Sequence, residues 1–296
     1  MPTLWKTSII CPVPKKAKVS TLNDFRPIAL TPVVMKCFER IVLTKLLSQT
    51  SHLLDPLQFA YKHNRGTDDA TITLLHFIQS HLEKPASFAR ILYVDFSSAF
   101  NTVQPHLMAH KLIKFGVDSR LVLWVIDFLV NRVQFVRCHN SLTGQPVMSS
   151  PCITHTGTPQ GTVVSPVLFT MYTDDCRCES AASHLVKYSD DTALVDLSNS
   201  HSHFTAEVNR FNLWCSDNFL NLNVQKTKEM IIDFRRSQTA EPELKIGDVS
   251  VERVNQYKYL GTVIDKKNST STQILITLSL SVKEGFSVSV NSAVSM

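Results

Sequence analysis

The amino-acid sequence predicts an α+β fold in which helices back an antiparallel sheet. Residues 91–94 form a continuous apolar run that stops at Asp95, which is typical of a buried central strand. Residues 185–188 and 192–195 are strand-like runs on either side of a tight turn, which predicts a β-hairpin. Between residues 32 and 47 the apolar side chains recur at helical spacing instead.

The first thirty residues are predicted to be mostly extended. Residues 8–14 predict a short strand, and Pro12 and Pro14 place it at a sheet edge or at a strand end. Residues 23–28 predict a second extended segment, because Arg26 precedes a proline and is biased away from helix.

Several helices are predicted from their apolar faces and start signals. Asp69 is expected to cap a helix. The buried face of that helix is expected to contain Ile72, Leu75, Ile78 and Leu82. Residues 121–131 and the stripe 208–219 predict two further helices. Ser165 is expected to be the N-cap of another helix, with Pro166 at its first position.

The last third of the chain begins with strands. Residues 228–234 and 257–264 predict strands, the second with Gly261 at a turn or bulge. Residues 268–296 differ from the rest, because they are rich in Ser and Thr and carry few charges. This composition predicts either disorder or a poorly specified strand.

The composition admits many functions. The chain has 296 residues, of which 44% are hydrophobic, and this is enough for a core in one or two domains. The net charge of +5 fits a polyanionic partner and equally an ordinary, slightly basic globular protein. Seven cysteines without a CxxC pair favour reduced thiols, with no disulfide partner, in an intracellular protein.

We expect no signal peptide and no membrane-spanning segment. The first twenty residues lack the apolar core of a signal peptide. The apolar run 121–130 is interrupted by Asp127 and is too short to cross a bilayer. The expected location is therefore the cytoplasm or the nucleus, without a membrane partner.

Three carboxylates stand at predicted strand ends. Asp95 ends the central strand, and Asp190 and Asp191 lie at the tip of the hairpin. If these elements are neighbours, hard oxygen ligands meet at one sheet edge, a set that suits Mg²⁺ held together with substrate phosphates. Two such ions, about 4 Å apart, activate a 3′-hydroxyl and stabilise a leaving pyrophosphate. Alternatively, Asp-Asp is an ordinary turn dipeptide and the strand-terminal aspartate caps a helix.

Neighbouring residues add to this hypothesis. Phe100 is placed to close a pocket beneath a nucleotide sugar, although a core aromatic is the usual fate of phenylalanine. Gln160 offers an amide, and Gly161 allows close backbone approach to a ligand. The alternative for these two is a plain loop before a helix.

Basic residues are candidates for contacts with phosphates. Lys226 is a candidate general acid toward a leaving pyrophosphate. Arg26, with Lys15 or Lys16, is a candidate clamp for a triphosphate. For each of these cations a solvated surface position is the alternative.

The order of these features resembles the reverse transcriptases of non-LTR (LINE-type) retrotransposons and, more distantly, those of group II introns. The resemblance runs from about Trp5 to Asp265. It is carried by Ile10–Lys16, Asn23–Leu30, Tyr93–Phe100, Gly157–Pro166, Tyr188–Asp191, Leu222–Lys228 and Tyr257–Gly261. Each segment is weak alone, whereas seven in this order are very specific.

The resemblance implies a right-hand polymerase palm with fingers, and an RNA-directed DNA polymerase. It implies two Mg²⁺ ions, with Mn²⁺ as a possible substitute. The implied partners are an RNA template, a DNA primer and dNTPs. Contacts to an A-form hybrid are expected to depend mainly on shape and backbone rather than on base sequence.

The resemblance also implies roles for matching residues in the catalytic centre. Asp95, Asp190 and Asp191 resemble the metal-binding triad. The carbonyl of Phe96 resembles a further metal ligand, and Lys226 is similar to the proposed general acid.

Other matching residues resemble those that bind the nucleotide and the primer. Phe100 resembles the steric gate that selects deoxynucleotides, and Gln160 and Gly161 resemble the loop that contacts nucleotide and template. Arg26 resembles the fingers residue that holds the triphosphate. The primer grip is matched by Tyr257, Leu260 and Gly261.

The chain departs from the family pattern in three respects. Ser189 stands where the family commonly has alanine. We expect the chain to be truncated, beginning inside the fingers without an endonuclease domain, and its thumb to be missing or degenerate. The expected organisation is fingers over residues 1–85, a palm with interposed fingers segments over 86–267, and a disordered Ser-rich tail over 268–296.

Two other functions stay open at this point. Because a missing thumb weakens the grip on a duplex, the chain is alternatively an inactive retroelement remnant or a nucleic-acid-binding module without turnover. A two-metal hydrolase rests on the acids alone. His106 and His110 have the i, i+4 spacing of metal ligands, but a solvated helix face explains them equally.

Overall fold

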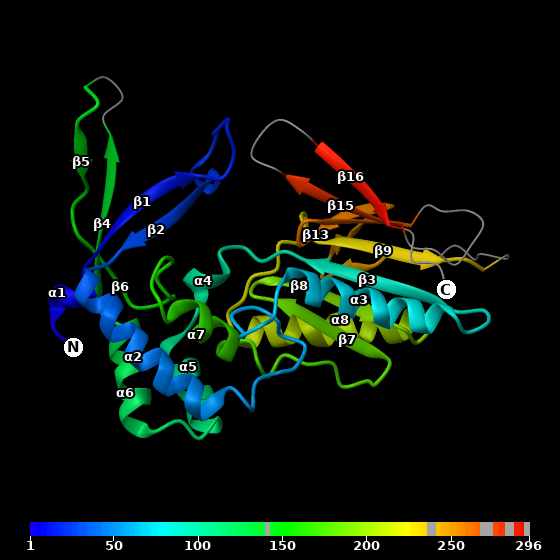
Figure 1. Cartoon of the computed structure of the whole chain (residues 1–296), viewed down its shortest axis with the longest axis horizontal. Coiled ribbons are helices and arrows are strands. Elements are labelled where there is room, and N and C mark those ends of the chain that lie inside the picture. The colour runs from blue at the N-terminus through cyan, green and yellow to red at the C-terminus, as the bar shows by residue number, and fades with distance from the viewer. Residues whose placement is uncertain (140–142, 236–240, 267–274, 282–286, 293–296) are drawn as a thin grey trace. The chain divides into compact units, whose positions relative to one another are not determined.

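The computed structural model describes residues 1–139, 143–235, 241–266, 275–281 and 287–292. The chain divides into two compact units, each built from two stretches (Figure 1). Unit 1 comprises residues 1–54 and 98–174, and unit 2 comprises residues 55–97 and 175–296. In the described part of the chain, no helix has the length and apolar character needed to cross a membrane.

Unit 1 contains a sheet of order β2-β1-β4-β5, with β6 also paired to β4. Its strands are β1 (Ser8–Pro14), β2 (Phe25–Leu30), β4 (Arg132–His139), β5 (Pro146–Met148) and β6 (Cys152–Thr154). Its helices are α1 (Thr3–Lys6), the 3₁₀ turn η1 (Leu22–Asp24), α2 (Val33–Thr50), α4 (Ala99–Thr102), α5 (Pro105–Lys114), α6 (Ser119–Leu129) and α7 (Ser165–Tyr172).

The prolines of β1 fit this sheet for a simple reason. β1 pairs with β2 over Ile9–Pro14, but it pairs with β4 only over Ser8–Ile10. Pro12 and Pro14 therefore lie beyond the β4 ladder, where a missing N–H costs no hydrogen bond on that side. The predicted strand over residues 8–14 is confirmed, whereas the second extended segment begins only at Phe25, after the 3₁₀ turn.

Unit 2 is built around a sheet of order β12-β9-β3-β8-β7. Its strands are β3 (Phe88–Val94), β7 (Ser183–Tyr188), β8 (Asp191–Asp196), β9 (Lys228–Asp233) and β12 (Glu252–Arg253). β3 lies in the centre and pairs antiparallel with β8 and β9. All seven residues of β3 are buried, as the continuous apolar run predicts. The unit also contains α3 (Thr67–Leu82), α8 (His201–Asp217) and the hairpin of β10 (Lys245–Ile246) and β11 (Val249–Ser250).

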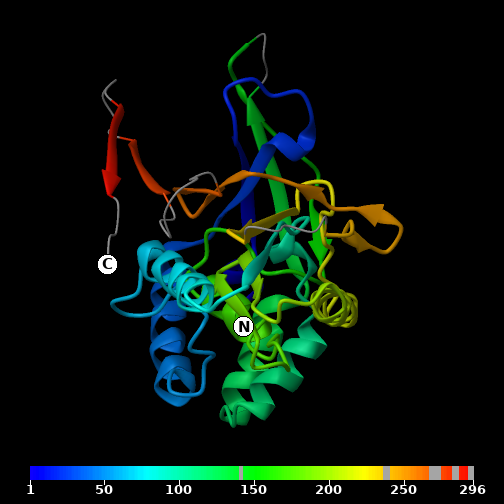
Figure 2. The same ribbon diagram turned by 90° about the vertical axis from the view of Figure 1, so that its right-hand side faces the viewer.

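The two faces of this sheet are covered by different helices, α3 and α8, as Figure 2 shows. Ile91 and Tyr93 join a core cluster with α3 residues such as Leu74. Arg90 points to the other face, where its guanidinium lies 4.5 Å from the ring centre of Phe204 in α8. Since side chains alternate along a strand, odd-numbered residues of β3 face α3 and even-numbered ones face α8.

A second sheet of order β13-β14-β15-β16 follows. Its strands are β13 (Gln256–Tyr259), β14 (Thr262–Asp265), β15 (Leu275–Ser281) and β16 (Ser287–Ser292), all paired antiparallel. The last two strands fall in the Ser-rich tail, for which the sequence left disorder and a poorly specified strand open. Residues 268–274, 282–286 and 293–296 of that tail lie outside the described residues.

Three local expectations are corrected. Asp69 is not the N-cap of α3; it is the third residue of the helix, and its carboxylate accepts the Gly66 N–H at 2.7 Å in a capping box. Ile72 is 65% exposed rather than on the buried face, because Ala70, Leu74 and Ile78 define that face. The N-cap of α7 is Val164 rather than Ser165.

The predicted boundary between residues 85 and 86 does not separate the compact units. α3 precedes this point and β3 follows it, yet both contribute to one core cluster in unit 2. The apolar face of α3 is buried against the sheet, so the helix and the strands form one body.

Candidate active site

Two of the three acids lie at neighbouring strand ends in unit 2. β3 and β8 pair antiparallel with Val94 opposite Thr192, so Asp95 leaves β3 beside Asp191, the first residue of β8. Both residues continue the odd-numbered series of their strands and therefore face the same side of the sheet. Asp190 precedes Asp191 in the two-residue turn between β7 and β8, since Tyr188 pairs with Asp191.

The acids perturb one another electrostatically. Local desolvation, followed by the charges of Asp190 and Asp95, raises the pKa of the Asp191 carboxyl to about 6. The Asp191 residue is nevertheless exposed to solvent on part of its surface, and Asp95 and Asp190 are half-buried. Crowded carboxylates that remain accessible are an arrangement that a bound cation would relieve.

Backbone contacts from the segment before β9 hold Asp95 in place. The Asp95 carbonyl accepts the N–H of Asn223 at 2.8 Å, and the Asp95 N–H donates to the hydroxyl of the fully buried Thr227 at 3.3 Å. The ammonium of Lys226 lies 3.9 Å from the Asp95 carboxylate. The structure thus brings Lys226 next to the acids, as expected if it serves the same reaction.

The tip of the acid hairpin is held by residues that the sequence patterns did not single out. Ser189 has φ +59°, a left-handed conformation that a non-glycine residue adopts only when its surroundings enforce it. The amide oxygen of the buried Gln58 accepts the Ser189 N–H at 3.1 Å. Lys187, also buried, pairs with Asp55 at 2.8 Å. The segment that contains Asp55 and Gln58 lacks a periodic signal, so only its three-dimensional pairing identifies it.

The hairpin of β13 and β14 lies on the same face of the sheet as the acids. The ring of Tyr257 stacks on Tyr93 of β3 with centroids 4.1 Å apart. Burial, followed by the charges of Asp191 and Asp95, raises the pKa of Tyr257. The turn residues Leu260 and Gly261 both have positive φ, +48° and +92°, the backbone of a two-residue hairpin turn. Tyr257 is therefore near the acids, and Leu260 and Gly261 form the turn of the same hairpin.

Phe96 belongs to unit 2, where its ring centroid lies 6.3 Å from that of Phe211 in α8, and the remaining predicted site residues belong to unit 1. Phe100 is half-buried in α4 and stacks on Phe169 of α7 with centroids 4.6 Å apart. Gly161 has φ +101°, and a Cβ there would approach the Ala29 carbonyl oxygen to 2.9 Å, so only glycine fits. Gln160 is its neighbour in the same loop.

The fingers cations have mixed surroundings in unit 1. Arg26 is exposed on β2, opposite Val13 of β1. Lys16 is 2.8 Å from the carboxylate of Asp24 and is thus engaged locally.

The three acids form a donor set of carboxylate oxygens. Asp95, Asp190 and Asp191 supply the hard oxygen atoms that Mg²⁺ prefers. Over residues 1–139, 143–235 and 241–266, however, no three His, Cys, Asp or Glu side chains are close enough together to form a ready-made ligand cluster. The predicted helical pair His106 and His110 gains no third ligand there either. The chemistry of the acids fits Mg²⁺.

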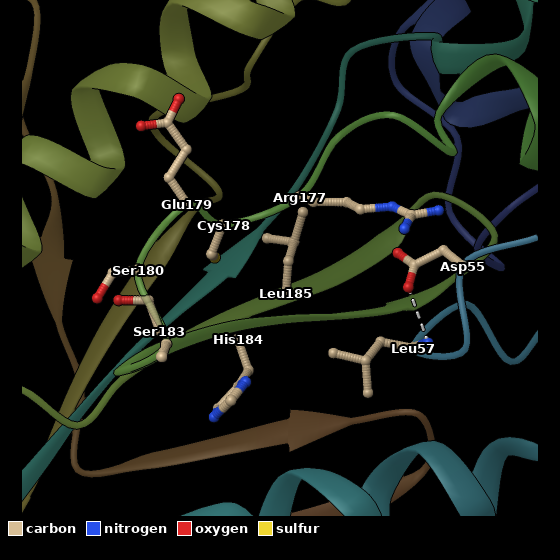
Figure 3. A pocket seen from close by; sticks show the side chains of 10 residues that line it. Asp55, Leu57, Arg177, Cys178, Glu179, Ser180, Ser183, His184 and Leu185 are labelled. Atoms are coloured by element: carbon tan, nitrogen blue, oxygen red, sulfur yellow. Dashed lines mark hydrogen bonds between the residues drawn. The ribbon is translucent and has the colours of Figure 1, made fainter. Parts of the chain in front are cut away.

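A separate pocket of about 300 Å³ lies on β7 (Figure 3). Its lining includes Asp55, Arg177, Cys178 and His184, and Arg177 extends toward Asp55. None of the three site acids lines this pocket. Burial raises the pKa of the Cys178 thiol to about 12, which makes it a poor nucleophile.

Comparison with solved structures identifies the fold. Apo telomerase from Candida tropicalis, truncated from its C-terminal domain, superposes with a TM-score of 0.57 and 11% identity over 89% of this chain and 54% of that one. Telomerase from the same organism, in complex with the TWJ fragment of telomeric RNA, gives a TM-score of 0.58 and 10% identity over 90% of this chain and 44% of that one. The predicted α+β, palm-type polymerase fold is thereby confirmed.

The sequence comparisons identify the family. The chain belongs to the reverse transcriptase (RNA-dependent DNA polymerase) family, whose model matches residues 13–264. This confirms the resemblance on which the sequence interpretation depends.

The relatives come from mobile elements of Drosophila melanogaster. A probable RNA-directed DNA polymerase from transposon BS is 26% identical over 90% of this chain and 30% of the relative. An RNA-directed DNA polymerase from mobile element jockey is 25% identical over 92% of this chain and 30% of the relative. The chain thus spans about 30% of the length of these relatives.

Proposed function

We propose that the chain is the RNA-directed DNA polymerase module of a non-LTR retrotransposon protein, adding dNTPs to a primer 3′-hydroxyl. The observation that carries this proposal is the placement of Asp95 and Asp191 at adjacent strand ends on one face, with Asp190 next in the chain. Family membership supports a polymerase over the hydrolase alternative.

In this proposal, Asp95, Asp190 and Asp191 hold two Mg²⁺ ions, for which Mn²⁺ is a possible substitute, and the Phe96 carbonyl is a further ligand. The bound ions supply activation of the 3′-hydroxyl and charge neutralisation at the phosphates. The 3′-hydroxyl releases its proton to solvent as its oxygen forms a bond to the α-phosphorus, and the bond between the α-phosphorus and pyrophosphate breaks. Lys226, whose ammonium lies 3.9 Å from Asp95, donates a proton to the departing pyrophosphate.

Residues of unit 1 select and hold the incoming nucleotide in this proposal. Arg26 binds the triphosphate, and its exposure on β2 leaves the guanidinium free to reach solvent. Phe100 excludes a 2′-hydroxyl, and its stacking on Phe169 would keep the ring in one orientation. Gln160 and Gly161 contact the nucleotide and the template. Because Gly161 has no Cβ, another group can approach its backbone closely.

The proposed partners are an RNA template and a DNA primer, within the cell, where both nucleic acids and dNTPs are available. One solved telomerase that shares the fold is in complex with a fragment of telomeric RNA, which supports an RNA ligand for this fold. The hairpin turn Leu260–Gly261, anchored by the stacking of Tyr257 on Tyr93, is proposed to grip the primer end.

The test is dNTP incorporation on a primed RNA template with Mg²⁺. We expect synthesis by the wild-type chain and a loss of at least about a hundredfold in Asp190→Asn, because one metal-binding charge is removed. Asp248→Asn, an exposed acid in the β10–β11 turn, is the matched control and should retain activity. Equal, background incorporation by the wild type and Asp190→Asn would reject polymerase activity in this chain.

A further inference from the structure

The loop that carries Gln160 and Gly161 is fastened at both ends within unit 1. Near its start, the N–H of Gly157 donates to the Val103 carbonyl and the N–H of Thr158 to the Phe100 carbonyl, both at 2.7 Å. In its middle, the Gln160 carbonyl accepts the Ala29 N–H of β2 at 2.6 Å. These bonds fix the first half of the loop, and the Thr162 hydroxyl donates to the Pro159 carbonyl at 3.0 Å, so residues 163 and 164 are left to be held by another contact.

The second half is held by Glu39, which lies more than a hundred residues earlier in α2. One carboxylate oxygen of Glu39, Oε2, accepts the N–H of Val163 at 2.5 Å and the N–H of Val164 at 3.1 Å. Val164 is the N-cap of α7, so the carboxylate lies at the positive end of that helix. Glu39 therefore connects α2, the loop and the start of α7 in one contact.

Glu39 is a costly residue to bury for stability alone. Its exposed fraction is 0%, and its second oxygen, Oε1, is buried with no hydrogen-bond partner among the described residues. Burial raises the pKa of Glu39, while the two amides and the charge of Arg132 act in the opposite direction. An apolar side chain would fill this place in α2 at lower cost, so what the carboxylate adds is the geometry of the loop.

We propose that Glu39 is a positioning residue for nucleotide binding: its carboxylate fixes the backbone of residues 163 and 164 and thereby the orientation of Gln160 and Gly161. The inference rests on the proposed function, because it assumes that this loop contacts the incoming nucleotide. Gln160 and Gly161 lie between the segment that Ala29 holds and the segment that Glu39 holds, so both attachments define the path of the loop.

The experiment compares three variants of the full chain in two assays. Glu39→Ala removes both accepted hydrogen bonds, whereas Glu39→Gln keeps an oxygen that accepts from Val163 and Val164. Leu46→Ala removes a fully buried side chain two turns further along α2 and controls for a general loss of stability. The first assay is hydrogen exchange of the peptide spanning residues 157–165, and the second is primer extension with kcat and KM for dNTP measured per active site.

In Glu39→Ala we expect the loop amides to exchange about tenfold faster, and the KM for dNTP to rise on the order of tenfold with a smaller change in kcat. Glu39→Gln should restore both values to within about threefold of the wild type. Leu46→Ala should lower the melting temperature and leave loop exchange and KM unchanged.

The two assays separate this inference from the proposed function. Unchanged loop exchange in Glu39→Ala overturns the positioning role whether or not the chain is active. Faster loop exchange with an unchanged KM in an active enzyme overturns the link to nucleotide binding. If the wild type synthesises no DNA, the proposed function is rejected, and the link between Glu39 and nucleotide binding is rejected with it. The hydrogen-exchange assay still decides whether Glu39 holds the loop.

Discussion

Replacing Asp191 by asparagine should stabilise the metal-free protein at neutral pH. The pKa of Asp191 rises from an ordinary value of 3.8 to about 6 in the folded state. The folded chain therefore binds this proton more tightly than the unfolded chain does, and stability falls as the pH rises from about 4 to above 6. Below that window the carboxyl is protonated in both states, and the penalty disappears.

The size of the effect follows from the pKa shift and the exposure of the side chain. A shift of about two pH units corresponds to roughly 3 kcal/mol at pH 8. Because Asp191 is exposed to solvent on part of its surface, screening should reduce this to about 1 kcal/mol. For a chain of this length that is a change in melting temperature of about 2 °C.

The assay is thermal unfolding in EDTA at pH 4 and pH 8. Asp191→Asn should melt about 2 °C above the wild type at pH 8 and together with it at pH 4. Asp248→Asn, in the exposed β10–β11 turn, should match the wild type at both values. Two results would contradict this reasoning: a melting temperature of Asp191→Asn below that of the wild type at pH 8, or the same increase in melting temperature at both pH values. Either result would show that repulsion between the carboxylates does not raise the pKa of Asp191. With Mg²⁺ added, the wild type should gain stability that the variant lacks.

Two further predictions concern the free energy of unfolding, one for a residue of unit 1 and one for a residue of unit 2. Gly161→Ala should lower the free energy of unfolding by about 2–3 kcal/mol, because it combines a left-handed backbone with a contact of 2.9 Å to the Ala29 carbonyl. Gly116 has φ +73° and open space around it, so Gly116→Ala should lower the free energy of unfolding by only about 1 kcal/mol in denaturant titrations. Equal losses in the two variants would show that the contact with the Ala29 carbonyl does not contribute. Arg90→Met should cost about 3 kcal/mol, since it leaves the carboxylate of Glu229 without one partner in a pair whose side chains are both 1% exposed. A loss below about 1 kcal/mol in urea titrations would show that this pair contributes little.

The parts of the site that the sequence predicts are those with a local signal. The apolar run that ends at Asp95 and the two short strands around Asp190 and Asp191 each fix an element from neighbouring residues alone. The pairing of β3 with β8 was left open by the sequence, and the structure shows it as an antiparallel pair.

The supporting contacts could not be predicted in the same way. Gln58 reaches Ser189 over 131 residues of sequence, and Glu39 reaches Val164 over 125. From the sequence, a glutamate within a helix such as Glu39 is expected to be exposed to solvent, and the neighbouring residues do not indicate that it is buried. Hydrogen bonds that join distant segments depend on the packed structure, which local periodicity does not encode. The same reason explains Ile72, which has the right spacing for the core face of α3 and yet is exposed.

The odd-numbered alignment of Asp95 and Asp191 constrains how related sequences can change. Adding or deleting one residue between 88 and 94 would turn Asp95 toward α8, while Asp191 stayed on the opposite side of the sheet. No compensating substitution at a single position would bring the two carboxylates back together. In related sequences, insertions or deletions within β3 or β8 should therefore comprise two residues or be absent, even where individual side chains are substituted.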